Sequence, residues 1–422
     1  MFGFGTGATW SGEIALRIDP HVLRSLFRKI TKGTIVVAGT NGKTTTSRMI
    51  KTLLEKEGYS VLHNDSGANL LNGVVSAFFV HPKASYDYAV FEVDENALPS
   101  VLSHLRTKNQ EPVTIVLLNL FRDQLDRYGE VDTIADHWKE ALQMLDAHAT
   151  VVLNADDPHL SYIGTFLKTS PRYFGLGDKT YYLPHMQHAT DTIYCPSCGE
   201  RLTFAGVYFS HLGDWECKKC TFTHPPLNLS GKDVLSPVEG VYNIYNTLAA
   251  TLVGQTIGLD THTMKKSIAS FHPAFGRMET CTYKGKTMRI LLSKNPTGCN
   301  ESLRTMLASK DKGPLLMLLN DRIPDGTDVS WIWDVDFEML VHDEHMIILS
   351  GDRALDMGVR VKYGITNYKL RMKNKTIILE KNLEKAVRQF TDVIKSGETG
   401  WIIATYSAML DVRKIITGKK IL

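Results

Sequence analysis

Seven consecutive residues near the start of the chain have the composition of a phosphate-binding loop. They read Gly39-Thr40-Asn41-Gly42-Lys43-Thr44-Thr45 and lie between an apolar run typical of a buried strand and a helical pattern. In that setting small residues let backbone N–H groups face phosphate oxygens, and the helix N-terminus adds positive charge. Lys43 can reach the β- and γ-phosphates, and Thr44 can hold Mg²⁺. The loop predicts a nucleotide site, although Val37 stands where a full Walker A motif has glycine; a structural strand-to-helix turn is the alternative.

Three carboxylates follow a second apolar run and are candidates for the Mg²⁺ site. They are Glu92, Asp94 and Glu95. A Mg²⁺ ion held by nucleotide phosphates normally takes one or two protein carboxylates as well. Alternation in an extended segment sends Glu92 and Asp94 to one side and Glu95 to the other, so at most part of the trio can face one ion. Glu92 is the preferred ligand and Glu95 the second; the alternative is a solvated acidic loop.

Four of the six cysteines form two C-x-x-C pairs separated by eighteen residues. They are Cys195, Cys198, Cys217 and Cys220. The start of the chain lacks a secretory signal, and in that context paired knuckles favour a metal over disulfides. Two such turns close a tetrahedral zinc site with no open position, which is structural rather than catalytic. The alternatives are a redox pair and a metal-free ribbon. The other two cysteines, Cys281 and Cys299, are isolated and have no local context for a catalytic thiol.

The elements that must position these residues read as an α/β fold. Short apolar, β-branched runs alternate with helical patterns over the first part of the chain. The runs are Thr34–Ala38, Tyr86–Val93, Val113–Asn119 and Val151–Asn154, and the helical patterns include Thr44–Glu57 and Ile134–Leu145. This alternation predicts a parallel sheet covered by helices on both faces, with ligands bound beyond the carboxyl ends of the strands.

Three segments and an insert follow from the pattern. Residues 1–32 read as an N-terminal arm with a possible amphipathic helix over Pro20–Ile30, 33–275 as a nucleotide-binding domain, and 276–422 as a second α/β domain. The cysteine knuckles interrupt the first domain at about 190–228. The second domain has candidate strands at Met288–Leu292, Pro314–Leu319, Met346–Ser350 and Trp401–Thr405, and candidate helices near Glu301–Ala308, Arg353–Val359 and Leu383–Ile394.

Composition excludes several classes of protein. The 422 residues carry 48 Lys and Arg against 45 Asp and Glu, a net charge of +3, so no basic field suggests nucleic acid as a partner. No apolar run approaches the roughly 18–20 residues that span a bilayer. The chain therefore reads as a cytoplasmic protein of ordinary globular composition.

Several strings together resemble the Mur ligases, which are ATP-dependent carboxylate–amine ligases of peptidoglycan synthesis related to folylpolyglutamate synthases. The strings are G-T-N-G-K-T-T, E-V-D-E, L-N-A-D-D-P at 153–158, N-x-x-N-T-L-A-A at 243–250 and G-R-M-E at 276–279. The resemblance implies a P-loop ATPase domain and a C-terminal Rossmann-like domain. Mur ligases usually carry a nucleotide-sugar-binding domain first, whereas only about 32 residues precede the first strand here.

A closer resemblance is to the MurT family of ligase subunits. It rests on the run from Asn119 to Glu130, the four-cysteine insert and the run Asp325–Asp334. It implies ATP-dependent amidation of D-glutamate to D-isoglutamine in the lipid II stem peptide, with ammonia from a GatD-like glutaminase in a heterodimer. It also implies visits to the inner membrane face. The alternatives are a stand-alone ligase that adds an amino acid to a carboxylate, and a nucleotide-sensing scaffold whose zinc ribbon recruits a partner.

The Mur ligase resemblance also implies roles for single residues. Gly42, Lys43 and Thr44 would hold the ATP phosphates and Mg²⁺, with Glu92 completing the Mg²⁺ shell. Asn246 and Asn243 would contact adenine, and Arg277 the nucleotide near the domain junction. Helix capping or internal hydrogen bonds are the alternative for the two asparagines, and an ion pair for Arg277.

One departure from the Mur pattern is visible, because Leu291 stands where many Mur ligases have an aspartate. Lys294 could supply positive charge to an acyl phosphate instead.

A run of acidic residues and tryptophans, residues 320–336, completes the set of candidates. By resemblance, one of its aspartates supports the Cys–His pair of the glutaminase partner; we expect Asp328, then Asp325. Trp331 and Trp333 lie nearby in a mixture common at interfaces. The alternative is a helix over 329–338 that Asp328 caps, with the tryptophans in the core.

Overall fold

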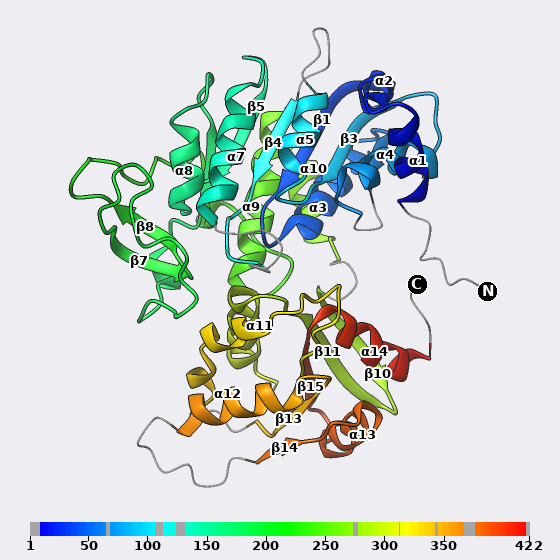
Figure 1. Cartoon of the computed structure of the whole chain (residues 1–422), viewed down its shortest axis with the longest axis vertical. Helices are drawn as coiled ribbons and strands as arrows, with labels where there is room; N and C mark the ends of the chain where they lie inside the picture. Colours follow the sequence, from blue (N-terminus) through cyan, green and yellow to red (C-terminus); the bar gives the residue numbers. More distant parts are fainter. Residues whose placement is uncertain are drawn as a thin grey trace. The chain divides into compact units, whose positions relative to one another are not determined.

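The computed structural model describes residues 9–64, 68–105, 113–123, 131–272, 277–311, 313–341, 345–366 and 376–418. Two compact units make up the chain. The first comprises Met1–Phe121, Glu130–Met186 and Thr190–His272, and the second comprises Arg122–Gly129, Gln187–Ala189 and Pro273–Leu422. Each unit is built around its own sheet (Figure 1).

A seven-stranded parallel sheet forms the centre of the first unit, in the order β2-β3-β1-β4-β5-β6-β9. The strands are β1 Ile30–Ala38, β2 Val61–His63, β3 Tyr86–Glu92, β4 Val113–Leu117, β5 Thr150–Asn154, β6 Arg172–Gly175 and β9 Leu229–Ser230. The central strands are buried almost without interruption, as expected for a sheet covered on both faces. The predicted parallel α/β sheet is therefore confirmed.

Helices cover both faces of this sheet. Three that contact one another lie on one face, namely α3 Lys43–Lys56, α9 Val241–Thr256 and α10 Thr261–Ala269. The other layer contains α4 Leu71–Val80, α5 Leu98–His104, α7 Val131–Gln143 and α8 Pro158–Gly164, with α1 Trp10–Ile18 and α2 Val22–Leu26 packed beside α4. The crossover direction reverses between β1–β2 and the later strands, which places α3 opposite α7.

The cysteine insert folds as a small hairpin-based ribbon. Strands β7 Thr203–Phe209 and β8 Leu212–Glu216 pair antiparallel between the two C-x-x-C knuckles (Figure 1). Its small core contains Leu202 and Trp215 packed against the cysteines. A cluster this small cannot bury much apolar surface. The stability of the ribbon therefore depends on a cross-link between its two cysteine knuckles.

The second unit holds a six-stranded sheet in the order β10-β11-β15-β12-β13-β14. Only β10 Arg277–Tyr283 is antiparallel; the parallel strands are β11 Lys286–Leu292, β12 Leu315–Leu318, β13 Ile347–Ser350, β14 Ile377–Leu379 and β15 Thr399–Ala404. The α-helices among the described residues of this unit are α11 Pro296–Ala308, α12 Ala354–Thr366, α13 Leu383–Val393 and α14 Tyr406–Thr417. Two apolar cores fill the opposite faces of this sheet.

Some predicted elements differ from the structure. The proposed helix over Pro20–Ile30 is confirmed in part: α2 covers Val22–Leu26 and a 3₁₀ turn covers Phe27–Lys29, but β1 already begins at Ile30. Strand β1 is therefore four residues longer than the predicted Thr34–Ala38. The alternative helix over 329–338 is replaced by two 3₁₀ turns, Ser330–Asp334 and Phe337–Leu340. Sequence patterns also missed β10, β14 and α14.

Candidate nucleotide site and metal centre

The predicted phosphate loop joins the buried end of β1 to the first turn of α3. Gly42 adopts a φ of +90°, and a Cβ atom there would lie 2.2 Å from Asn246 Oδ1. Gly39 adopts a φ of +144°, and a Cβ atom there would lie 2.9 Å from Leu118 Cβ. Both positions therefore require glycine for conformation and for space. The backbone N–H groups that open α3 lie at a helix N-terminus, which is the setting of other helix-terminal phosphate sites.

Asn119, at the end of β4, holds the loop in place. Its Oδ1 accepts a hydrogen bond from the Asn41 amide at 2.8 Å, and its Nδ2 donates to the Asn41 carbonyl at 3.0 Å. A second pair of bonds joins Thr40 and Phe121: the Thr40 hydroxyl accepts from the Phe121 amide at 2.9 Å and donates to its carbonyl at 3.1 Å. The loop is thus fixed before any ligand binds, which lowers the ordering cost of binding.

Lys43 is folded back onto the loop. Its Nζ donates to the Gly39 carbonyl at 2.5 Å and lies 2.9 Å from Glu95 Oε2, and the side chains of Lys43 and Glu95 are 7% and 3% exposed. A buried ammonium of this kind needs such oxygen partners. A bound phosphate would present Lys43 with a competing anion, so the lysine is placed to exchange a carboxylate for phosphate oxygens.

Glu92 ends β3, beside the strand that leads into the loop. Val37 of β1 pairs with Glu92, whose backbone is fixed by the Asn64 amide at 3.0 Å and 2.8 Å. Glu92 is 4% exposed, so its carboxylate is almost fully buried. A buried carboxylate in this state fits a cation ligand. Asp94 instead accepts from the Asn96 amide at 3.1 Å in the turn that follows.

Asn243 and Asn246 occupy one buried face of α9, against α3. Asn246 Oδ1 accepts from Thr46 Oγ1 at 3.2 Å, and its Nδ2 donates to Asn243 Oδ1 at 3.1 Å. Their amides therefore brace the start of α3, and the adenine contact remains a prediction. Arg277 begins β10, and its side chain lies outside the described residues.

The four clustered cysteines converge on one point. Cys195 and Cys220 Sγ atoms are 3.6 Å apart, as are those of Cys198 and Cys217, and all four lie within 4.8 Å of one another. A tetrahedral Zn²⁺ with Zn–S bonds of about 2.3 Å requires sulfur separations of about 3.8 Å. The Cys220 backbone amide lowers the pKa of Cys217 to about 7, whereas burial raises that of Cys195 to about 12, so the grouping of the sulfur atoms carries the case for a metal. The cluster fits a structural zinc ion.

The ribbon is anchored to the D-D-P turn that follows β5. Asp156 accepts from Tyr245 Oη at 2.5 Å and from His224 Nε2 at 2.8 Å, and Asp157 Oδ2 lies 3.4 Å from His211 Nε2. Burial alone would raise the pKa of Asp157, but the imidazoles of His211 and His159 and the Leu120 amide hold it below its ordinary value.

The same carboxylate reaches the loop support. Asp157 Oδ2 also accepts from the Leu120 amide at 2.9 Å, next to the Phe121 that bonds Thr40. The insert therefore shares one buried network with the nucleotide loop. Sequence reasoning missed His211 and His224, whose spacing relative to Asp156 and Asp157 carries no local signal.

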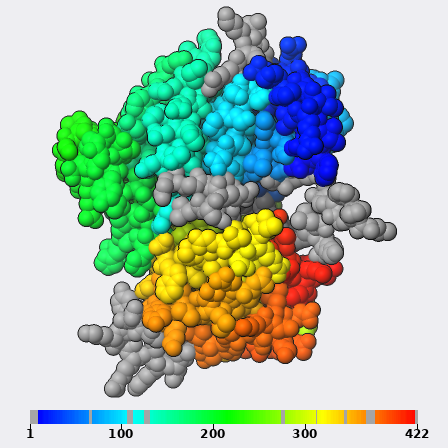
Figure 2. Space-filling model, in the orientation of Figure 1, coloured from blue at the N-terminus to red at the C-terminus, as the bar shows by residue number. Residues whose placement is uncertain are grey.

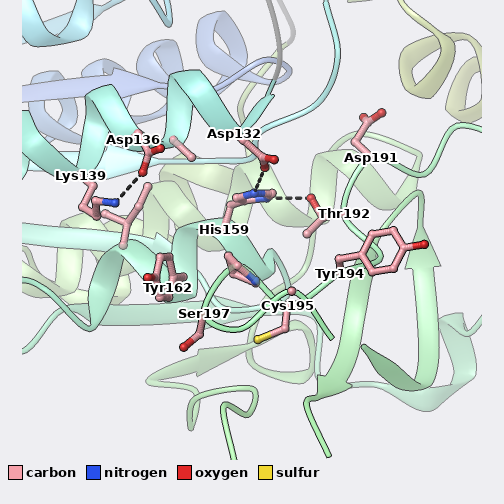
Figure 3. Close-up of a pocket in the computed structure, with 14 residues that line it drawn as sticks. Asp132, Asp136, Lys139, His159, Tyr162, Asp191, Thr192, Tyr194, Cys195 and Ser197 are labelled. Carbon is pink, nitrogen blue, oxygen red and sulfur yellow. Dashed lines mark hydrogen bonds and ion pairs between the residues drawn. The ribbon is translucent and has the colours of Figure 1, made fainter. Parts of the chain in front are cut away.

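A cavity of about 370 Å³ lies beside the first cysteine knuckle, between α7, α8 and the insert (Figure 3). His159 bridges its wall, with Nε2 2.7 Å from Asp132 Oδ1 and Nδ1 2.8 Å from Thr192 Oγ1. These two hydrogen bonds hold His159, and with it the start of α8, in place. Thr192 is only 2% exposed, so its hydroxyl is not an accessible nucleophile.

The acidic run of the second unit separates its two candidate aspartates. Asp325 is 3% exposed and accepts hydrogen bonds from the Ser407 amide, at 2.7 Å, and from its hydroxyl, in the first turn of α14. Asp328 is exposed and accepts from the Ser330 amide at 2.8 Å. Asp325 therefore caps a helix, whereas Asp328 is available at the surface. Trp333 nearby is 53% exposed.

The remaining predicted residues of the second unit have simple surroundings. Leu291 is 2% exposed in the apolar core, and Lys294 forms an ion pair with Asp123. Burial raises the pKa of Cys281 to about 11 and that of Cys299 to about 12, so neither is a thiolate at neutral pH.

Comparison with known proteins identifies the family. Residues 37–254 match the Mur ligase middle domain, and residues 292–409 match the MurT ligase C-terminal domain. The chain is 31% identical to the lipid II isoglutaminyl synthase (glutamine-hydrolyzing) subunit MurT of Streptococcus pneumoniae over 99% of this chain and 94% of the relative. The chain belongs to the MurT family of Mur ligases. The MurT subunit of Staphylococcus aureus strain N315 is also 31% identical, over 92% of this chain and 88% of its own.

Solved Mur ligase structures share the fold. A pseudomurein peptide ligase type C from Methanothermus fervidus superposes with a TM-score of 0.69 at 22% identity, covering 94% of this chain and 81% of the other. The MurF ligase of Thermotoga maritima in complex with ADP gives 0.63 at 18% identity, over 98% and 84%. The resemblance inferred from the motifs is thus confirmed for this MurT-family chain, which is a carbon–nitrogen ligase. None of its described helices is long and apolar enough to cross a bilayer.

Proposed function

We propose that this MurT-family chain is the ligase subunit of a lipid II isoglutaminyl synthase. It would amidate the α-carboxylate of D-glutamate in the lipid II stem peptide, with ATP as the energy source and ammonia from a GatD-like glutaminase. The observation that carries the proposal is the near-complete match to curated MurT subunits at 31% identity. The preformed loop with its buried Lys43 supports the use of ATP.

The chemistry requires an activated carboxylate. Ammonia does not displace hydroxide from a carboxylate in water, whereas phosphate leaves readily from an acyl phosphate. Lys43 and the amides at the start of α3 would neutralise charge on the transferring phosphoryl group. Thr44 and Glu92, with Glu95 as a second carboxylate, are the residues that would hold Mg²⁺, which would supply further charge neutralisation at the phosphates.

The glutaminase partner would supply ammonia in its neutral form, which solvent at neutral pH does not. The raised pKa values of Cys281 and Cys299 and the zinc-type grouping of the other four cysteines support a nucleophile in another chain. We expect Asp328, which is exposed on the second unit, to orient the Cys–His pair of that partner. Asp325 is the less suitable candidate, because its buried carboxylate accepts hydrogen bonds from Ser407 at the start of α14. Lys294 would contribute positive charge near the acyl phosphate.

Reconstitution tests this function. The purified chain and a candidate glutaminase are mixed with lipid II, ATP and glutamine, and the stem peptide is analysed for D-isoglutamine. Amidation that needs both chains, with ADP and phosphate as products, supports the proposal. Ligation of a free amino acid in preference to ammonia would instead favour a stand-alone folylpolyglutamate-synthase type of ligase, and absence of ATP turnover in the assembled complex would favour a scaffold.

A further inference from the structure

The hairpin of the cysteine insert has a buried turn. Ser210 and His211 join β7 to β8, and both residues are 0% exposed. Turns between strands usually run over the protein surface. Ser210 also adopts a φ of +51°, which a serine rarely takes, so contacts around the turn must hold it. The insert forms a lobe at one side of the first unit, coloured green in Figure 2, but its turn is buried inside that unit.

Aromatic contacts place this turn against the support of the nucleotide loop. The ring of His211 lies 5.0 Å from the ring of Phe121, measured between centroids, and the ring of Phe209 lies 5.8 Å from it. The backbone of Phe121 forms the two hydrogen bonds that hold the Thr40 hydroxyl. A single residue therefore separates the insert from the phosphate loop.

A buried carboxylate makes a second connection between the turn and the loop. His211 Nε2 lies 3.4 Å from Asp157 Oδ2, and both side chains are 0% exposed. The same oxygen accepts a hydrogen bond from the Leu120 amide at 2.9 Å. Leu120 stands between Asn119 and Phe121, the two residues that fasten the loop. The imidazole of His211 thus contacts both a ring and a carboxylate that hold these two residues.

Phe209, the residue before the turn, extends the contact to α9. Its ring lies 5.5 Å from the ring of Tyr245 in an edge-to-face arrangement. Tyr245 precedes Asn246, whose Oδ1 accepts from the Thr46 hydroxyl at 3.2 Å in the first turn of α3. The hairpin therefore meets the supports of the nucleotide loop at two places, the end of β4 and α9.

We infer that His211 is a positioning residue for the nucleotide: through Phe121 and Asp157 it holds the phosphate loop in the conformation that binds ATP. The inference rests on the proposed nucleotide site and gives the insert a role besides its own fold. A loop that is fixed in advance loses little conformational freedom when ATP binds. Loosening the loop should therefore weaken the binding of ATP more than it slows the reaction of ATP that is already bound.

Substitutions of His211 test the inference in the purified full chain, with the affinity for ATP and Mg²⁺ measured by titration calorimetry. We expect His211→Ala to bind ATP about tenfold more weakly, because a buried polar contact and a ring contact are lost. His211→Gln places an amide nitrogen near the position of Nε2, whereas His211→Asn places one near Nδ1. The glutamine variant should therefore recover part of the affinity and the asparagine variant should not. Tyr182→Phe, which removes a hydrogen bond to Asp214 of the same hairpin, is the matched control and should bind ATP like the wild type.

Two further measurements separate positioning from a general loss of structure. In the complex with its glutaminase, the KM for ATP of His211→Ala should rise about tenfold while kcat falls less than about twofold. Amide hydrogen exchange without nucleotide should become faster in residues 39–45, whereas thermal unfolding of the glutamine and asparagine variants should stay close to that of the wild type.

Several outcomes would overturn the inference. They are equal affinity for ATP in the wild type and His211→Ala, equal affinity in the glutamine and asparagine variants, and a fall in kcat with an unchanged KM for ATP. If His211→Ala does not fold, the comparison of the glutamine and asparagine variants decides. Absence of ATP binding by the wild type would overturn the proposed nucleotide site itself, and the inference with it.

Discussion

The side chain of Lys43 donates hydrogen bonds to the carbonyl oxygens of Gly39 and Thr40 in its own loop and to a carboxylate oxygen of Glu95. Its ion pair with Glu95, at 2.9 Å, is buried, and the two glycines of the loop adopt backbone angles that other residues rarely take. The nucleotide loop therefore depends on the ion pair between Lys43 and Glu95 and on the conformations of Gly39 and Gly42.

Lys43→Ala should lower ATP-dependent amidation by about a hundredfold or more, because a positive charge on the transferring phosphoryl group is lost. It should leave association with the glutaminase intact. The change also leaves the buried carboxylate of Glu95 without its ion-pair partner. The double variant Lys43→Ala/Glu95→Gln, which removes that unpaired charge, is therefore measured as well. Lys51→Ala on the same helix is the control. Amidation that persists in Lys43→Ala would mean that the nucleotide site is elsewhere.

Gly42→Ala should weaken nucleotide binding and destabilise the first unit, because the added methyl would lie 2.2 Å from Asn246 Oδ1 in a residue with positive φ. Gly58→Ala shares the positive φ, +89°, but has no atom within 4 Å of the new methyl. We expect the control to cost only about 1 kcal/mol of unfolding free energy, and Gly42→Ala to cost more. Equal costs, measured by denaturant unfolding, would exclude the clash.

Glu301 predicts a pH dependence of stability. Burial raises its pKa from 4.5 to about 6. Its contribution to stability is therefore fully present below pH 4.5 and is lost as pH rises through about 6, a loss of about 2 kcal/mol. Glu301→Gln should remove this slope and unfold at higher temperature than the wild type at pH 7. The exposed Glu384→Gln should retain the slope; a wild-type curve that is flat between pH 4.5 and 6 would contradict the prediction.

Apolar patterns in the sequence predicted most of the strands and helices that position these residues. Periodic apolar runs located the buried strands and the helix after the loop, because burial on both faces leaves a continuous signal. Strand β14 was missed because Ile377 and Leu379 are partly exposed at a sheet edge, and α14 because its start depends on the distant Asp325. The contacts of His211 and His224 with Asp157 and Asp156 were also out of reach, since they join segments more than fifty residues apart.

The insert should depend on zinc for its fold. Chelation, or Cys217→Ser, should release the metal and expose the segment between β7 and β8 to protease, because the ribbon core is too small to persist alone. Loss of the metal should also raise the KM for ATP more than it lowers kcat. The effect would reach the nucleotide loop through His211, Asp157 and the Leu120 amide. Cys281→Ser, outside the cluster, should change neither property. A ribbon that resists protease after complete metal removal would contradict this account.

At the scale of the whole molecule, the chain has a first unit with the nucleotide loop and a second unit in which Asp328 and Trp333 are exposed. The proposed division of labour with a glutaminase predicts that amidation from glutamine and amidation from ammonium can be separated. Asp328→Asn should abolish glutamine-dependent amidation while amidation with added ammonium salts persists, because the ligase site is untouched. The exposed Asp392→Asn, on α13, is the control. Equal loss with both nitrogen sources would place Asp328 in another role.

Transfer of nitrogen from glutamine to the stem peptide is the most direct test of the account. The assembled complex is given lipid II, ATP and glutamine labelled with ¹⁵N at the side-chain amide, in the presence of unlabelled ammonium, and the stem peptide is analysed by mass spectrometry. The account predicts ¹⁵N in the amide of D-isoglutamine and none when ATP is omitted. An unlabelled amide, or an intact amino acid added to the carboxylate, would contradict it.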